Sequence, residues 1–165
     1  MLKNSFKTRL DALYEEIHEA CLKSGRKKDE VDLIAVSKGH EISAIKDLYH
    51  LGVRDFGENY AQEFSKKFHD CEEQGLKIKW HYIGVIQSNK INLVAKADVV
   101  HSVSSVRHAE LLDKAASKNI DCFLQVDLKG DRNGFLTDEI LSFLAQPWPF
   151  KNLEFRGLMR SEEHT

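Results

Sequence analysis

Apolar residues along the chain recur at two different spacings, and their alternation predicts a repeated order of strands and helices. Residues 33–36 are apolar at every position, as expected for a short parallel strand that is covered on both sides. Before them, apolar residues recur every three or four positions, which is typical of one face of a helix that ends near Gly25. These residues are Phe6, Leu10, Leu13, Ile17 and Cys21.

Five further strands are predicted from the same alternation. Helical spacing between them predicts helices from Ile42 to Tyr49, from Tyr60 to Cys71, from Ser88 to Ala97, from a cap at Ser104 or Ser105 to Ala116, and from a cap at Thr137. The strands are expected at residues 53–56, 78–83, 98–101, 122–126 and 153–157. Six strands separated by helices imply right-handed crossovers in a parallel α/β sheet, which is either doubly wound or part of a (β/α) barrel.

Composition favours one globular domain without a strongly charged partner. The 165 residues are 42% hydrophobic, and 24 basic against 26 acidic residues give a net charge of −2, so attraction to nucleic acid or to an anionic membrane is not expected. No apolar run is long enough for a signal peptide or a membrane span, and we expect a soluble, cytoplasmic protein. The three cysteines and eight histidines do not follow the spacing of a disulfide framework or a metal site.

Lys38 follows the first predicted strand directly, at the carboxyl end where parallel α/β folds collect their ligand sites. One interpretation is an ordinary exposed lysine at a strand end. The other is an amine whose pKa is depressed by burial, so that it can form an imine with an aldehyde cofactor. Position alone leaves both interpretations open.

Polar residues also stand at the ends of the next three strands, at 57–59, 81–84 and 101–102. If the strands are parallel neighbours, these side chains meet at one rim. Taken singly, Asn59 is explained as a helix cap, His81 as a satisfied core histidine and Ser102 as a loop hydroxyl. Their recurrence at successive strand ends is what favours a shared site.

Several motifs give the chain a resemblance to a known family. They are Val36-Ser37-Lys38, Asp55-Phe56-Gly57-Glu58-Asn59, Trp80-His81-Tyr82-Ile83-Gly84, Ile86-Gln87-Ser88-Asn89-Lys90, His101-Ser102-Val103 and Gly157-Leu158-Met159. In order and spacing they resemble the pyridoxal phosphate homeostasis proteins, which are related to the amino-terminal barrel of alanine racemase. The resemblance runs from Leu33 to Met159, and the stretch from Trp80 to Lys90 is its most distinctive part.

The resemblance implies a type III (β/α)8 barrel of the TIM type that binds pyridoxal 5'-phosphate (PLP). Lys38 would carry the cofactor as a Schiff base, Asn59 would lie near its ring, His81 and Ser102 would lie in its surroundings, and Met159 would face the pocket. The departures from the family pattern are Gly39 in place of a frequent threonine, Val85 in place of a polar residue or proline, and Ser104 in place of a common aspartate.

The function implied by the resemblance is PLP homeostasis, in which the protein holds the cofactor without substrate turnover and hands it on, with apo-enzymes that need PLP as recipients. A monomer is expected for the full-length protein. The enzyme alternative is a racemase-like catalyst, which would need a second acid/base group on the opposite face of the cofactor. A third alternative is an interaction module without a cofactor, supported only by a weak basic patch at Lys90, Lys96 and Arg107.

The sequence after Met159 departs from the family pattern. Residues 160–165 resemble an artefactual tail, so we expect residues 1–159 to form a partial barrel domain of about six strands. Barrels of this kind bind a cofactor's phosphate with the loops of the last two strands. A chain without those strands is therefore expected to bind PLP poorly or to fold incompletely, whereas a full-length parent would bind it well.

Overall fold

A computed structural model gives the structure of the chain, and it describes residues 2–128 and 133–160. Six parallel strands form one sheet in the order β1-β2-β3-β4-β5-β6, so each strand pairs with the next one in sequence. This confirms the predicted number and direction of the strands, and the sequential order is that of a barrel and not of a doubly wound sheet. The strands are β1 (Ala35–Val36), β2 (Asp55–Glu58), β3 (Lys79–Tyr82), β4 (Val99–Val103), β5 (Ile120–Gln125) and β6 (Leu153–Met159).

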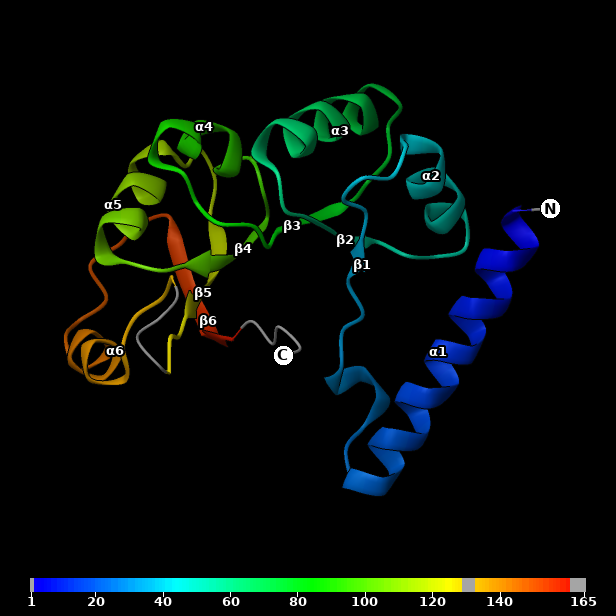
Figure 1. Ribbon diagram of the computed structural model, residues 1–165, viewed down its shortest axis with the longest axis horizontal. Coiled ribbons are helices and arrows are strands. Elements are labelled where there is room, and N and C mark those ends of the chain that lie inside the picture. Colours follow the sequence, from blue (N-terminus) through cyan, green and yellow to red (C-terminus); the bar gives the residue numbers. More distant parts are fainter. Residues whose placement is uncertain (1, 129–132, 161–165) are drawn as a thin grey trace.

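The helices between the strands lie along one side of the curved sheet (Figure 1). They are α2 (Ile42–His50), α3 (Ala61–Glu73), α4 (Ile91–Val94) preceded by the 3₁₀ turn η2 (Ser88–Lys90), α5 (Val106–Ala115) and α6 (Thr137–Leu144). A doubly wound sheet carries helices on both faces, whereas a barrel carries them outside only. The arrangement is therefore that of a (β/α) barrel wall, with β1 and β6 at its two ends.

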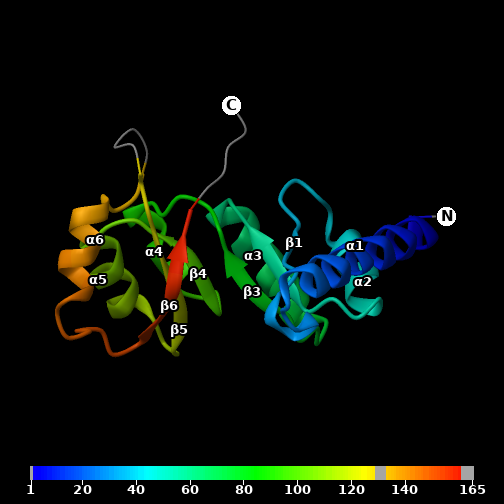
Figure 2. The ribbon, with the colours of Figure 1, turned by 90° about the horizontal axis from the view of Figure 1, so that it is seen from below.

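The first helix stands apart from this wall. α1 (Leu2–Ser24) contacts α2 and the 3₁₀ turn η1 (Lys28–Glu30), and Figure 2 shows it running beside α2. It ends where predicted, because Gly25 takes a φ of 68° that favours glycine. No helix in residues 2–128 and 133–160 is long and apolar enough to cross a membrane.

Most strand boundaries differ from prediction by one or two residues, and two differences, the length of β1 and the cap of α6, have identifiable reasons. β1 is only Ala35–Val36 instead of 33–36, because it lies at the end of the sheet and pairs with β2 alone. α6 begins at Thr137, but its N-cap is Leu136, so the predicted cap at Thr137 is wrong. The predicted cap at Ser105 is confirmed, since its side chain accepts a hydrogen bond from the His108 backbone N–H at 3.2 Å.

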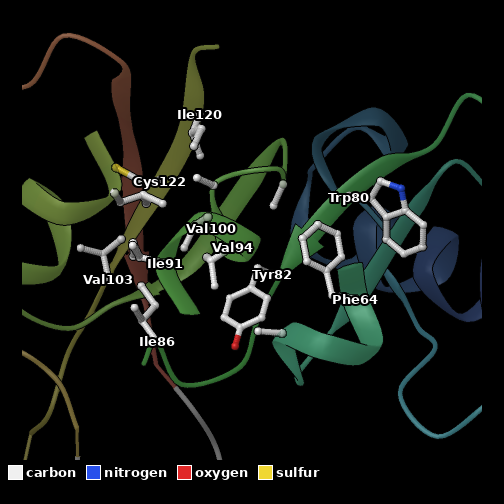
Figure 3. Packing of buried hydrophobic residues seen from close by; sticks show 14 of the residues in the cluster. Phe64, Trp80, Tyr82, Ile86, Ile91, Val94, Val100, Val103, Ile120 and Cys122 are labelled. Atoms are coloured by element: carbon white, nitrogen blue, oxygen red, sulfur yellow. The ribbon is translucent and has the colours of Figure 1, made fainter. Parts of the chain in front are cut away.

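The hydrophobic core lies between the sheet and the outer helices. Phe64 of α3 packs edge-on against Trp80, with ring centroids 5.7 Å apart, and its centroid is 6.2 Å from that of Tyr82. Figure 3 shows these rings together, and it shows how the core continues along the sheet through further apolar residues. Those residues are Ile86, Ile91, Val94, Val100, Val103, Ile120 and Cys122. Trp80 and Tyr82 thus fix the orientation of β3, with His81 on the opposite face.

The opposite, inner face of the sheet can be traced from Gly57. A Cβ placed on Gly57 would lie 3.2 Å from the side chain of Ile34, 3.3 Å from that of Ile83 and 3.6 Å from that of Val36. These residues therefore share one face, and His81 joins them because side chains alternate along a strand. In a closed barrel this face lines the interior.

Candidate functional site

The carboxyl ends of β1, β2 and β3 form a continuous rim. The Ser37 backbone N–H donates to the Gly57 carbonyl at 3.0 Å, and the Ile83 N–H donates to the Glu58 carbonyl at 3.0 Å. Beyond these bonds, Gly84 packs against the Asn59 backbone so closely that a Cβ on Gly84 would lie 1.8 Å from the Asn59 carbonyl oxygen. Only glycine fits there, and its small size lets the two loops meet.

Lys38 occupies a tight turn at this rim. The His40 N–H donates to the Ser37 carbonyl at 3.0 Å, which closes a four-residue turn with Lys38 and Gly39 at its centre. Gly39 has a φ of 71°, as the third residue of a type II turn requires. The departure from the family's threonine at this position therefore has a structural reason.

The Lys38 side chain is exposed, so the expectation that burial shields its amine is wrong for this chain. The reason is that β1 is an end strand with a neighbour on one side only. Among the residues that the structure describes, none forms a hydrogen bond or an ion pair with the Lys38 amine. The amine is thus free of the acidic partners that would hold it in an ion pair.

A buried charged network lies directly behind the Lys38 turn. The Lys67 ammonium of α3 donates to the Ser37 carbonyl at 2.6 Å, to Glu58 Oε1 at 2.7 Å and to Glu63 Oε1 at 2.7 Å. The Ser37 hydroxyl donates to the same Glu58 oxygen at 2.7 Å, and the Gly39 N–H donates to Glu63 Oε1 at 2.7 Å. The hydrogen bond from Lys67 lowers the pKa of Glu63.

Sequence reasoning missed this network. Lys67 is buried although lysine is rarely so, and Glu58 is fully buried. The sequence does hold a signal, because Lys67 falls on the same helical face as Phe64 and Cys71, and Glu63 precedes it by four residues. A lysine on the apolar face of a helix indicates that its ammonium is buried beside an acidic or hydrogen-bonding partner.

Asn59 is half-buried at the end of β2, and its side-chain oxygen Oδ1 is buried without a hydrogen-bond partner in the described part of the chain. It does not cap α3, whose N-cap is Tyr60 without a side-chain cap bond, so the helix-cap interpretation is wrong. Asn59 instead lines a cavity of about 240 Å³ between the loops that follow β2 and β3. The other lining residues are Tyr60, Ala61, Gln62, Tyr82, Gly84, Val85, Gln87 and Lys90.

Ser102 and Met159 occupy other parts of the rim. Ser102 of β4 is buried and donates its hydroxyl hydrogen to the Gly84 carbonyl, so it ties β4 to the loop that meets Asn59. Met159 is half-buried at the end of β6, and its carbonyl accepts from the Val126 N–H at 2.9 Å. The structure therefore brings Asn59 and Ser102 together through Gly84, whereas Met159 lies four strands away from β2.

His81 lies below the rim, on the inner face. Its Nε2 is 2.9 Å from Asp55 Oδ1 at the start of β2, and its Nδ1 is 2.9 Å from His101 Nε2 of β4. Burial lowers the pKa of His81 and lowers that of His101 to about 4, so both rings are neutral near pH 7. Because the carboxylate only accepts, His81 Nε2–H donates to Asp55 and His101 Nε2–H donates to His81. His101 also stacks on Phe123 of β5, with centroids 4.7 Å apart.

The contacts of His81 with Asp55 and His101 are those expected of a satisfied core histidine. They fit that interpretation better than a position on the rim. Within the described residues, no group of three or more His, Cys, Asp or Glu side chains is arranged to hold a metal ion. The rim of the described chain therefore offers a primary amine on the turn after β1 and, at the end of β2, a buried amide oxygen without a hydrogen-bond partner.

Comparisons with known proteins also relate this chain to proteins associated with PLP. A family model described as the alanine racemase N-terminal domain matches residues 9–161. Pyridoxal phosphate homeostasis proteins of Haemophilus influenzae and Pseudomonas aeruginosa are 33% and 36% identical over 91% and 90% of this chain. A structure of PipY from Synechococcus elongatus with PLP bound is 36% identical, with a TM-score of 0.75, and covers 88% of this chain and 70% of its own. The chain spans 66% of the length of the Haemophilus and Pseudomonas proteins.

Proposed function

The chain belongs to the pyridoxal phosphate homeostasis protein family, and from that membership we propose that it binds PLP through Lys38 and holds the cofactor without turning over a substrate. The observation that carries the proposal is the position of Lys38. It lies at the carboxyl rim of a parallel barrel wall, with its amine unpaired among the described residues. The structure of PipY, which contains PLP, supports the same cofactor.

The residues at the rim fit such a group. PLP supplies an aldehyde, with which a primary amine such as that of Lys38 can condense. The Asn59 oxygen is buried without a partner in the described chain, and a buried acceptor of this kind is costly unless a ligand or water donates to it. We propose that Asn59 lies beside the bound ring.

The other predicted residues have supporting roles in this proposal. Ser102 holds the Gly84 carbonyl and thereby the loop that meets Asn59. His81 orders the inner face beneath the rim through Asp55 and His101. Met159, at the end of β6, is proposed to face the pocket from its opposite side.

The domain boundaries, partners, oligomeric state and location are proposed from the family and from the part of its members' length that this chain covers. Residues 1–159 are proposed to form a partial barrel domain, with residues 160–165 as a tail of no function; 161–165 lie outside the described residues. Transfer to apo-enzymes and a monomeric full-length protein are part of the same proposal. A cytoplasmic location is supported by three free, buried cysteines.

The proposal is tested by borohydride reduction of the purified chain with PLP, followed by peptide mapping. We expect the reduced label on the peptide that contains Lys38, and a loss of at least tenfold in Lys38→Arg, because a guanidinium keeps the charge but does not condense with the aldehyde. Lys66→Arg, at an exposed lysine of α3, is the matched control and should keep the label. Label spread evenly over exposed lysines would contradict a specific site.

A racemase-like enzyme is the second candidate, since alanine racemases share the fold. It would exchange the α-proton of an amino acid, which requires a second acid/base group. An α-proton exchange assay in deuterated water with several amino acids separates the two candidates. No exchange above the rate of free PLP is expected for a holding protein, and faster exchange that is lost in Lys38→Arg would favour the enzyme.

A further inference from the structure

We infer that Lys67, with Glu63 and Glu58, is the device that positions the Lys38 turn, so that these three residues act as positioning residues for cofactor attachment. The inference rests on the proposed function of Lys38. In the described part of the chain, none of the three forms a hydrogen bond or an ion pair with the Lys38 side chain. They act on the backbone that carries it, on both sides of the residue.

The contacts flank Lys38 in sequence. On its amino side, the Lys67 ammonium holds the Ser37 carbonyl at 2.6 Å, and the Ser37 hydroxyl is bound to Glu58 at 2.7 Å. On its carboxyl side, the Gly39 N–H is bound to Glu63 Oε1 at 2.7 Å. A turn that is fixed at the residue before and the residue after has little freedom to redirect the side chain between them.

The charges explain why the arrangement is rigid. The Lys67 side chain is 8% exposed and that of Glu58 is fully buried, so the pair is screened little by water. An ammonium has three hydrogens to donate, and Lys67 has three acceptors in place: the Ser37 carbonyl, Glu58 and Glu63. Loss of the ammonium would leave two carboxylates close together without a cation between them.

The network contains two contacts with the main chain in addition to its ion pairs. A buried pair adds little net stability compared with apolar residues of similar size. Here one cation is shared between two acids and a main-chain carbonyl, and one of the acids also binds a main-chain N–H of the turn. The two main-chain groups belong to Ser37 and Gly39, the residues directly before and after Lys38. This supports a role of the network in positioning Lys38.

Glu63→Ala is the sharpest test, because it removes the Gly39 contact and leaves the buried Lys67–Glu58 pair. The Glu63 side chain is 28% exposed, so its removal is expected to be tolerated by the fold. We expect amide exchange of Gly39 to accelerate at least tenfold, and the rate at which PLP with borohydride labels Lys38 to fall about three- to tenfold. Faster exchange with unchanged labelling would overturn the positioning role.

Lys67 supplies the larger perturbation. Lys67→Met should reduce Lys38 labelling at least tenfold, and Lys67→Arg should restore part of it, since guanidinium donors can reach the same acceptors. Lys66→Met, one position away and exposed, should change neither labelling nor exchange. If Lys67→Met does not fold, Glu63→Ala and Lys67→Arg decide the question.

The two proposals fail in different ways. Absence of Lys38 labelling in the unmodified chain would refute the proposed function. Unchanged exchange of the Gly39 and His40 amides in Glu63→Ala would refute the inference, whether or not the unmodified chain is labelled. Nuclear magnetic resonance or mass spectrometry of the full chain provides the exchange rates.

Discussion

The two faces of the sheet are built from alternate residues of the same strands, but they differ in what they contain. On the outer face, Trp80 and Tyr82 pack with Phe64 under the helices and are 2% exposed. On the inner face, His81 lies between those two residues in sequence and is bound to Asp55 and His101. Aromatic packing on the outer face stabilises the wall, whereas the inner face combines apolar side chains with hydrogen bonds that orient the two histidines.

The largest expected difference between the faces is in packing energy. Phe64→Ala should lower the free energy of unfolding by about 3–5 kcal/mol, because a fully buried ring is lost and a cavity remains. Phe123→Ala on the inner face should lower it by roughly half as much, since Phe123 is only half-buried. Urea unfolding of both variants measures the difference, and equal losses would show that the inner face is covered in solution.

The inner histidines should make stability depend on pH. The pKa of His101 is about 4 in the folded chain against 6.5 in an unfolded one, and that of His81 is also lowered. The unfolded state therefore binds more protons between these values, and the free energy of unfolding should fall as pH drops from about 6.5 to about 4. The slope per histidine is at most about 1.4 kcal/mol per pH unit.

Urea unfolding at several pH values gives this slope. His101→Phe keeps a ring against Phe123 and removes one titrating group, so it should flatten the dependence. A slope unchanged by His101→Phe would mean that other groups govern acid stability.

The smallest effect is expected at the exposed edge. Val36→Thr should change the free energy of unfolding by no more than about 0.5 kcal/mol, because Val36 is 45% exposed. Val100→Thr places the same hydroxyl at a fully buried site of the outer core and should cost about 1–3 kcal/mol. Thermal unfolding of the two variants compares them, and a cost at Val36 as large as at Val100 would indicate that another segment or a second chain covers β1.

Much of the fold could be predicted from periodicity because each strand and helix is specified locally. Segments such as 53–56 and 122–126 are close to the observed β2 and β5, and the alternation of elements predicted parallel strands. It left the strand order open between a doubly wound sheet and a barrel. The extent of β1 could not be predicted, since it depends on how many neighbours the strand has. The sequence pattern predicts Thr137 as the cap of α6, because threonine is a common N-cap residue. The N-cap is instead Leu136, whose N–H donates to Glu139 at 2.9 Å.

The site was predicted in part. Strand ends placed Lys38, Asn59 and Ser102 on one rim, since carboxyl ends of parallel strands meet there. The inner position of His81 required knowing which face Trp80 packs on. Lys67 was missed because a lysine on a helix is normally solvated, and its burial depends on a carbonyl 30 residues away in sequence.

The uninterrupted succession of strands has a consequence for synthesis on the ribosome. Every new strand finds its only required neighbour already made, because β2 pairs with β1, β3 with β2, and so on to β6. The nascent polypeptide can thus add one strand and one helix at a time, without waiting for a distant segment to emerge. Lys38 and its supporting helix α3 come early in that succession, so every segment that forms the amine-bearing turn is synthesised before β4, β5 and β6.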